Sequence, residues 1–184
     1  MSNTFFISDH HFYHSNILTF RDQDENLIRP DFFDVYEMNE FMIERWNSVV
    51  GVNDKVYHLG DVLMSTARNK FESILPRLNG TKVLIKGNHD NAKLSIYADY
   101  FKDVRSEVGL KLDQKAYITF THRPIRLHEE NEHSGANPYF NVHGHIHQNV
   151  IDDRRYLNVS VENINYTPIS IEELKEHFYK RFDL

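Results

Sequence analysis

Histidine and aspartate side chains gather in a few short stretches of this sequence. The first, "SDHHFYHSN" at residues 8–16, places an aspartate and three histidines directly after a short apolar run. Four others are "LGDV" (59–62), "GNHD" (87–90), "TH" (121–122) and "HGHIH" (143–147). Eight of the 12 histidines belong to these stretches: His10, His11, His14, His89, His122, His143, His145 and His147. So many imidazoles and carboxylates have little structural use at strand ends, so they predict a binding site.

The spacing within two of these stretches favours metal binding. In an extended chain successive side chains alternate, so Asp9 and His11 are expected to point the same way and His10 the opposite way, into a packing or supporting role. The same alternation pairs His145 with His147. Mixed imidazole and carboxylate ligands suit Mn, Fe, Zn or Ni better than Ca, which prefers oxygen alone.

The number of candidate ligands predicts two ions. The set is Asp9, His11, Asp61, Asn88, His122, His145 and His147. One ion does not normally take so many protein ligands, whereas a bridging carboxylate such as Asp61 lets two ions lie about 3.5–4 Å apart. Such a pair lowers the pKa of a shared water and holds both oxygens of an in-line displacement at phosphorus.

The five stretches together resemble the signature of the calcineurin-like metallophosphoesterases. In order and spacing they follow D-x-H, G-D, G-N-H-[DE], a lone His and G-H-x-H, over about residues 4–160. The resemblance is closest to small single-domain bacterial and phage members. It implies an α/β fold, a four-layered α/β/β/α sandwich, and we expect residues 1–184 to form a single domain.

The resemblance also implies a role for each candidate. One metal would be held by Asp9, His11, Asp61 and His147, and the other by Asp61, Asn88, His122 and His145. Asp61 would bridge the ions, and His89 would act as a catalytic residue on the leaving-group side. The sequence departs from the phosphoprotein phosphatases at Met64, where they carry an aspartate that orients this histidine. Protein phosphatase activity is therefore disfavoured, and the group that orients His89 is left open.

These features predict a metal-dependent phosphodiesterase acting on a small or nucleotide-like substrate, because no cap segment for enclosing a monoester is evident. A hydroxide bridging two divalent transition metals, Mn²⁺ first and Fe, Zn or Ni as alternatives, would attack phosphorus in line. Phosphomonoesterase or nucleotide phosphatase activity, or a nuclease acting on short ends, are alternatives. A non-catalytic scaffold is disfavoured because His89 and every expected ligand are present.

Composition limits the partners and the location. With 21 basic and 27 acidic residues the formal net charge is -6, which disfavours a broad basic face for long nucleic acid. No apolar run approaches the roughly 20 residues that cross a membrane, and the N-terminus lacks the features of a secretory signal. The absence of cysteine fits a cytoplasmic protein.

Strands and helices alternate along the predicted chain. Hydrophobic patterns predict strands at 4–8, 55–60, 82–87, 103–109, 116–121, 139–143 and 156–162, and helices at 35–49, 67–78, 92–100 and 170–182. Residues 21–34 are expected to form a long loop. Most of the histidine-rich and aspartate-rich stretches follow a strand, and the carboxyl ends of strands in an open α/β sheet form one ligand-binding rim.

Several weaker candidates remain. His14, Arg21 and Arg123 are candidate substrate contacts, since a guanidinium matches a phosphate with two hydrogen bonds. His143 is expected to orient a ligand, Asp90 to cap the next helix, and Trp46 to lie in the core. Glycines precede several ligands and are expected to permit tight turns: Gly60, Gly87 and Gly144. The remaining histidines are expected to be ordinary surface or core residues: His58, His128, His133 and His177.

Overall fold

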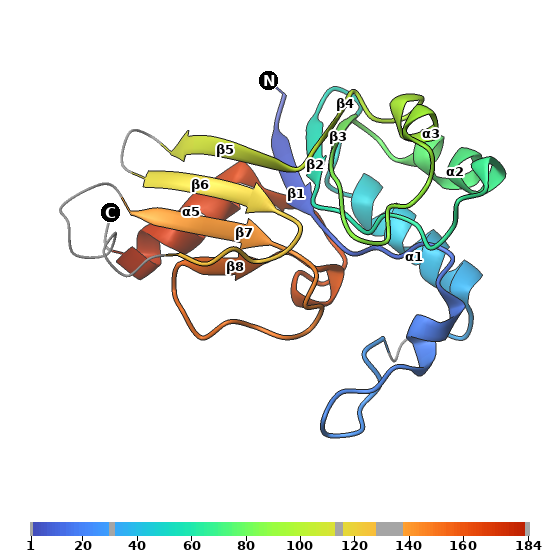
Figure 1. Ribbon diagram of the computed structural model, residues 1–184, viewed down its shortest axis with the longest axis horizontal. Helices are drawn as coiled ribbons and strands as arrows, with labels where there is room; N and C mark the ends of the chain where they lie inside the picture. Colours follow the sequence, from blue (N-terminus) through green and yellow to red (C-terminus); the bar gives the residue numbers. More distant parts are fainter. Residues whose placement is uncertain (1, 30–31, 113–115, 128–137, 183–184) are drawn as a thin grey trace.

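Two β-sheets and their helices make up this protein (Figure 1). The computed structural model describes residues 2–29, 32–112, 116–127 and 138–182. The predictions for His128 and His133 concern positions outside the described residues. In the part of the chain that is described, no helix has the length and apolar character needed to cross a membrane.

The first sheet has five strands in the order β4-β3-β2-β1-β9. They are β1 (Thr4–Ile7), β2 (Lys55–His58), β3 (Thr81–Ile85), β4 (Asp103–Arg105) and β9 (Ile169–Ser170). The strands β1 to β4 are parallel, and β9 pairs antiparallel with β1. Because parallel neighbours end at the same edge, the segments after β1, β2 and β3 meet there.

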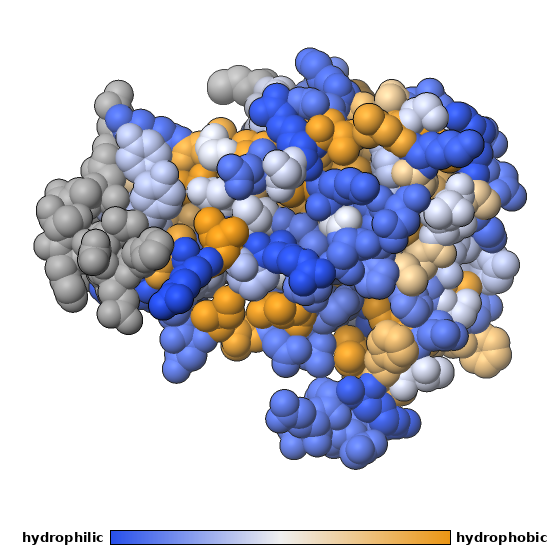
Figure 2. Space-filling model, in the orientation of Figure 1, coloured by the Kyte–Doolittle hydropathy of each residue, from blue (hydrophilic) through white to orange (hydrophobic). Residues whose placement is uncertain are grey.

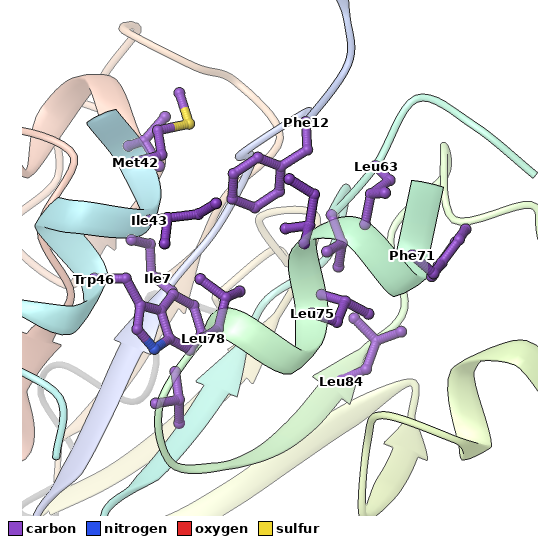
Figure 3. Packing of buried hydrophobic residues seen from close by; sticks show 14 of the residues in the cluster. Ile7, Phe12, Met42, Ile43, Trp46, Leu63, Phe71, Leu75, Leu78 and Leu84 are labelled. Atoms are coloured by element: carbon purple, nitrogen blue, oxygen red, sulfur yellow. The ribbon is translucent and has the colours of Figure 1, made fainter. Parts of the chain in front are cut away.

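Helices α1 (Val35–Asn47), α2 (Arg68–Ile74) and α3 (Leu94–Ala98) bury one face of this sheet. Helix α1 begins where the Asp34 carboxylate accepts hydrogen bonds from the backbone amides of the first turn, a strong start signal. Figure 3 shows Ile43 and Trp46 of α1 meeting Ile7 of β1 and Leu78. Trp46 is fully buried, which confirms its predicted place in the core.

The second sheet has the order β5-β6-β7-β8. Its strands are β5 (Glu107–Leu112), β6 (Ala116–Thr121), β7 (Tyr139–His143) and β8 (Tyr156–Asn158). Only β5 and β6 are antiparallel; β6, β7 and β8 run parallel. In Figure 1 the arrowheads of β6 and β7 point toward the half of the molecule that carries β1 to β3.

The two sheets and the C-terminal helix α5 (Ile171–Phe182) share a second core. Phe6 of β1 stacks on Phe120 of β6 with ring centroids 4.3 Å apart, which joins the sheets. Phe178 of α5 stacks on Phe140 of β7 at 4.2 Å. The predicted layered α/β fold is confirmed, with helices packed against both sheets.

Three predicted elements differ from the structure. The single strand expected at 103–109 is two strands, β4 and β5, which belong to different sheets. The strand expected at 156–162 ends at Asn158, and a 3-10 turn (Val161–Asn163) follows. The helix expected at 67–78 ends as the 3-10 turn Leu75–Arg77, because Pro76 cannot donate the next helical hydrogen bond.

The predicted loop 21–34 is confirmed at its described residues. It lies between the 3-10 helix Ser15–Thr19 and α1, and an isolated bridge pairs Arg21 with Leu27. Figure 1 shows this segment projecting from the body, and the projecting lobe in Figure 2 is mostly hydrophilic. Its polar tip does not contribute to either core, whereas Phe32 at its base packs against the first core.

Candidate metal centre

The candidate ligands come together in two groups at the carboxyl ends of the strands. One group contains Asp9, His11 and His147, and the other contains Asp61, His122 and His145. Within each group, one potential ligand atom of every residue lies within 4.8 Å of the others. Four loops of the chain, those after β1, β2, β6 and β7, therefore supply the two groups.

Asp61 lies between the two groups. Its Oδ2 atom is 3.6 Å from His11 Nε2 in the first group and 3.3 Å from His122 Nε2 in the second. Asn88 belongs to the second group, since its Oδ1 is 3.0 Å from His122 Nε2. All seven predicted ligands thus meet, with a carboxylate where a bridging ligand is expected.

The backbone at these residues is unusual. Five of the seven adopt a left-handed conformation that favours glycine: Asp9 (φ 60°), His11 (φ 50°), Asp61 (φ 57°), His145 (φ 73°) and His147 (φ 50°). Each such residue costs on the order of 1–3 kcal/mol, a strain that gathers at functional sites. The extended-chain reasoning that paired Asp9 with His11 and His145 with His147 was wrong, because these residues have a left-handed backbone. Asp9 and His11 nevertheless share a group, whereas His145 and His147 fall in different groups.

Two glycines permit the loops to approach closely. A Cβ at Gly144 would lie 2.2 Å from Asp9 Oδ2, and one at Gly87 would lie 2.2 Å from Asp61 Oδ1. Of the three glycines predicted to permit tight turns, Gly60 alone has a left-handed backbone (φ 96°) that itself favours glycine. The other two therefore serve contact between loops rather than a turn.

Several buried polar atoms of the centre have no hydrogen-bond partner among the described residues. They are Asp9 Oδ1 and both ring nitrogens of His11. Burial raises the pKa of Asp9 and lowers the pKa of His11 to about 2. Burial is the largest single influence and opposes ionisation of Asp61, but the hydrogen bond and charge of His122, the amide of His89 and the charge of His11 together outweigh it and hold the pKa of Asp61 at about 2. Unpartnered carboxylate and neutral imidazole atoms fit divalent cations.

His89 lies beside both groups without belonging to either. Its backbone amide donates to Asp61 Oδ1 at 2.8 Å, and its ring packs edge-on to that of His11 at 5.4 Å. The side chain is exposed, so it can reach a bound substrate. Met64, where an orienting aspartate would stand in a phosphoprotein phosphatase, is 36% exposed.

Comparison with known proteins identifies the family. The model of the calcineurin-like phosphoesterase superfamily domain matches residues 4–163. The chain belongs to this superfamily. It is a phosphoesterase of the metal-dependent kind, a hydrolase that acts on phosphate esters.

Three individual proteins are similar to this chain. The chain is 34% identical over 180 residues to the uncharacterized protein MJ1445 of Methanocaldococcus jannaschii, covering 94% of this chain and 89% of that protein. It is 34% identical over 92 residues to the gene 66 protein of Mycobacterium phage L5, covering 49% of this chain and 41% of that protein. The crystal structure of AQ665, a protein of unknown function from Aquifex aeolicus, has 27% identity and a TM-score of 0.73, covering 96% of this chain and 99% of that one.

Behind the first group of this phosphoesterase lies a buried ion pair that sequence reasoning missed. Arg29, 1% exposed, donates to the backbone carbonyls of Asp9 (2.6 Å) and His10 (2.8 Å) and to Glu162 (2.7 Å). Glu162 in turn bonds the ring of His147 at 3.1 Å. Burial opposes ionisation of Glu162, but the Arg29 charge and the bond to His147 hold its pKa at about 2.

The second group is supported by a backbone carbonyl and by the carboxylate of Asp90. His122 Nδ1 bonds the carbonyl of Leu59 at 2.8 Å. Asp90 was predicted to cap a helix, and this is wrong: its carboxylate accepts from the backbone amides of Asp61, Val62 and Gly87. Asp90 therefore fixes the loop after β2 against the loop after β3, while α3 begins at Leu94 and its N-cap residue, Lys93, makes no side-chain capping bond.

The three predicted substrate contacts lie in different places. His14 packs edge-on to His11 with centroids 5.6 Å apart, while its Nδ1 accepts from the amide of Ile17. Arg123 is exposed and lines a cavity of about 400 Å³ together with Asn88 and His122. Arg21 instead bonds the carbonyl of Glu25 inside its own loop.

Three further histidines lie close to the ligand loops. His10 Nδ1 and His58 Nε2 share a buried hydrogen bond of 2.8 Å, and His58 Nδ1 accepts from the amide of Gly60. His10 thus supports the loops, as expected, and His58 does so too. His143 was expected to orient a ligand. Its Nδ1 bonds the carbonyl of Gly144 at 2.9 Å, and Gly144 directly precedes the candidate ligand His145.

Proposed function

We propose that this protein is a phosphodiesterase that hydrolyses a small or nucleotide-like phosphodiester with the aid of two divalent metal ions. The observation that carries the proposal is the shared position of Asp61. One carboxylate faces two groups of imidazole and carboxylate ligands, and an exposed histidine lies next to it. This arrangement suits a displacement at phosphorus.

The residues fit the metals in number and chemistry. The first ion would be held by Asp9, His11, Asp61 and His147, and the second by Asp61, Asn88, His122 and His145. Neutral imidazoles and ionised carboxylates are the forms that bind metals. When bound, two such ions activate a water and neutralise charge on the phosphoryl oxygens. Manganese is the first ion to test, with iron, zinc or nickel as alternatives.

His89 would stabilise the departing alcohol. Its amide is fixed by Asp61 Oδ1, which places the exposed ring at the edge of the centre. From there its imidazole can donate a hydrogen bond or a proton to the leaving oxygen. Arg123 would bind a phosphate oxygen, since it lines the cavity with Asn88 and His122.

A diester is favoured over a monoester because residues at the rim of the second ligand group are accessible from solvent, although Asp61 and His122 themselves are buried. Asn88, His89 and Arg123 are all exposed, so the scissile phosphate can carry an organic group on either side. Phosphomonoesterase and short-end nuclease activity are the alternatives that a substrate comparison would reveal.

A substrate panel tests the proposal. With Mn²⁺ we expect turnover of bis-p-nitrophenyl phosphate and of cyclic or short nucleotide diesters, at higher kcat/KM than p-nitrophenyl phosphate. Replacing His89 with Ala should reduce kcat by about a hundredfold or more without changing metal content. His177→Ala, a half-buried position on α5, is the matched control and should retain full activity. Turnover of the monoester alone, or full activity of His89→Ala, would refute the proposal.

A further inference from the structure

Arg29 is buried although it belongs to a mostly polar loop. It comes from the polar segment before α1, yet its guanidinium is among the most deeply buried polar groups of the protein. Nη2 and Nη1 bond the carbonyls of Asp9 and His10, within the turn that carries the first D-x-H ligands. Burying a cation costs free energy unless it is paired and hydrogen-bonded, so this contact has to be compensated.

Glu162 supplies the compensation and extends the contact to a third ligand. Its Oε1 atom accepts from Arg29 Nε at 2.9 Å and Nη2 at 2.7 Å, and it bonds His147 Nδ1 at 3.1 Å. A carboxylate on Nδ1 keeps the proton there and leaves the Nε2 lone pair free for a metal. The side chain of Glu162 is only 3% exposed, so solvent does not compete for it.

No comparable pair stands behind the second group among the described residues. His122 is held by a backbone carbonyl, and the contact of His145 with a carboxylate runs through its backbone amide, to Asp9 Oδ2. The Arg29–Glu162 pair therefore touches two of the three residues in one group directly and none in the other.

We propose that Arg29 and Glu162 are positioning residues that set the metal affinity of the first site selectively. They hold the Asp9 turn and the His147 ring in one arrangement, so the first ion binds a preformed site. This inference rests on the two-metal centre of the proposed function but not on its substrate. Removing a carboxylate that orients a metal-bound histidine lowers affinity by about 10–100-fold.

Calorimetric titration of metal-free protein with Mn²⁺ tests this selectivity. The two binding steps are assigned with His147→Ala and His145→Ala, each of which should lack one step. Glu162→Gln should weaken the His147-dependent step by about 10–100-fold and change the other by less than about twofold. Glu162→Ala should weaken the same step further, because Gln keeps an acceptor for Nδ1–H. Arg29→Lys should show the same selectivity as Glu162→Gln.

Asp153→Asn is the matched control. It removes a carboxylate from another partly buried pair, with Arg155, and should leave both steps unchanged. If Glu162→Gln and Arg29→Lys weaken both steps equally, or neither step, the positioning role is refuted. A wild-type protein that binds no Mn²⁺ would instead refute the two-metal centre itself. If Glu162→Ala does not fold, Glu162→Gln and Arg29→Lys still decide the question.

Discussion

The two ligand groups contain similar side chains but differ in what surrounds them. Behind the first group, the side chains of Arg29, Glu162 and Ser160 hold its residues in place. Around the second group, backbone supplies the support on one side and a cavity with Arg123 opens on the other. From this difference we expect a division of roles, in which the first site would hold its ion more firmly and the second would contact the substrate.

Replacing Asp61 should affect both ligand groups at once, and it has the largest expected effect. Because Asp61 faces both groups, Asp61→Asn should weaken both metal sites. Each ion stabilises the charge of the transition state by several kcal/mol, so kcat should fall by about a thousandfold or more. Metal content by elemental analysis and kcat on the preferred diester measure the effect. Loss of only one ion would show that Asp61 belongs to a single group.

Single histidines should separate the two sites. His147→Ala is expected to abolish the first binding step and His145→Ala the second, with kcat reduced by about a hundredfold or more in each. Mn²⁺ titration and steady-state kinetics provide the measurement. His177→Ala serves as the control. Loss of the same step in both variants would contradict the assignment of these histidines to different groups.

Much of this centre could be predicted from sequence, because ligand identity is written in local motifs that follow strands. Asp9, Asp61 and His122 could be predicted as ligands from the order of their motifs along the chain. The division of His145 from His147 did not follow from alternation, since Gly144 and left-handed turns replace the extended backbone there.

The supporting residues could not be predicted. Arg29 and Glu162 are 133 positions apart, and neither belongs to a motif. Only the fold brings them together, by seating the loop before α1 against the turn after β8. Similarly, residues 103–109 carry a continuous strand pattern although β4 and β5 join different sheets, because which sheet a strand joins depends on distant partners.

Acid should weaken both sites in parallel. Burial opposes charge on His122 and His147, but carboxylate contacts outweigh it and raise both pKa values above 6.5, in one histidine of each group. A metal needs the neutral form, so protons compete as pH falls. Between pH 8 and pH 6, Mn²⁺ affinity should fall by up to about tenfold per unit at each site. Titrations at three pH values check this; affinity that rises in acid would contradict it.

The smallest effect concerns backbone strain. All three residues of the first group have a left-handed backbone, whereas in the second group His122 does not. In that group His145 has a left-handed backbone. In metal-free protein, His145→Gly should be more stable than His145→Ala by about 1 kcal/mol, because Ala keeps the unfavourable φ. At His122 the order should reverse, with Ala the more stable. Urea denaturation of the four variants measures both differences, and equal stabilities at His145 would rule out strain there.

The most direct test of the two-metal centre is anomalous diffraction from a crystal equilibrated with Mn²⁺ and collected at the manganese absorption edge. We predict two peaks, one contacting Asp9, His11 and His147 and the other contacting Asn88, His122 and His145, with the Asp61 carboxylate contacting both. A single peak, or two peaks that Asp61 does not join, would contradict the account.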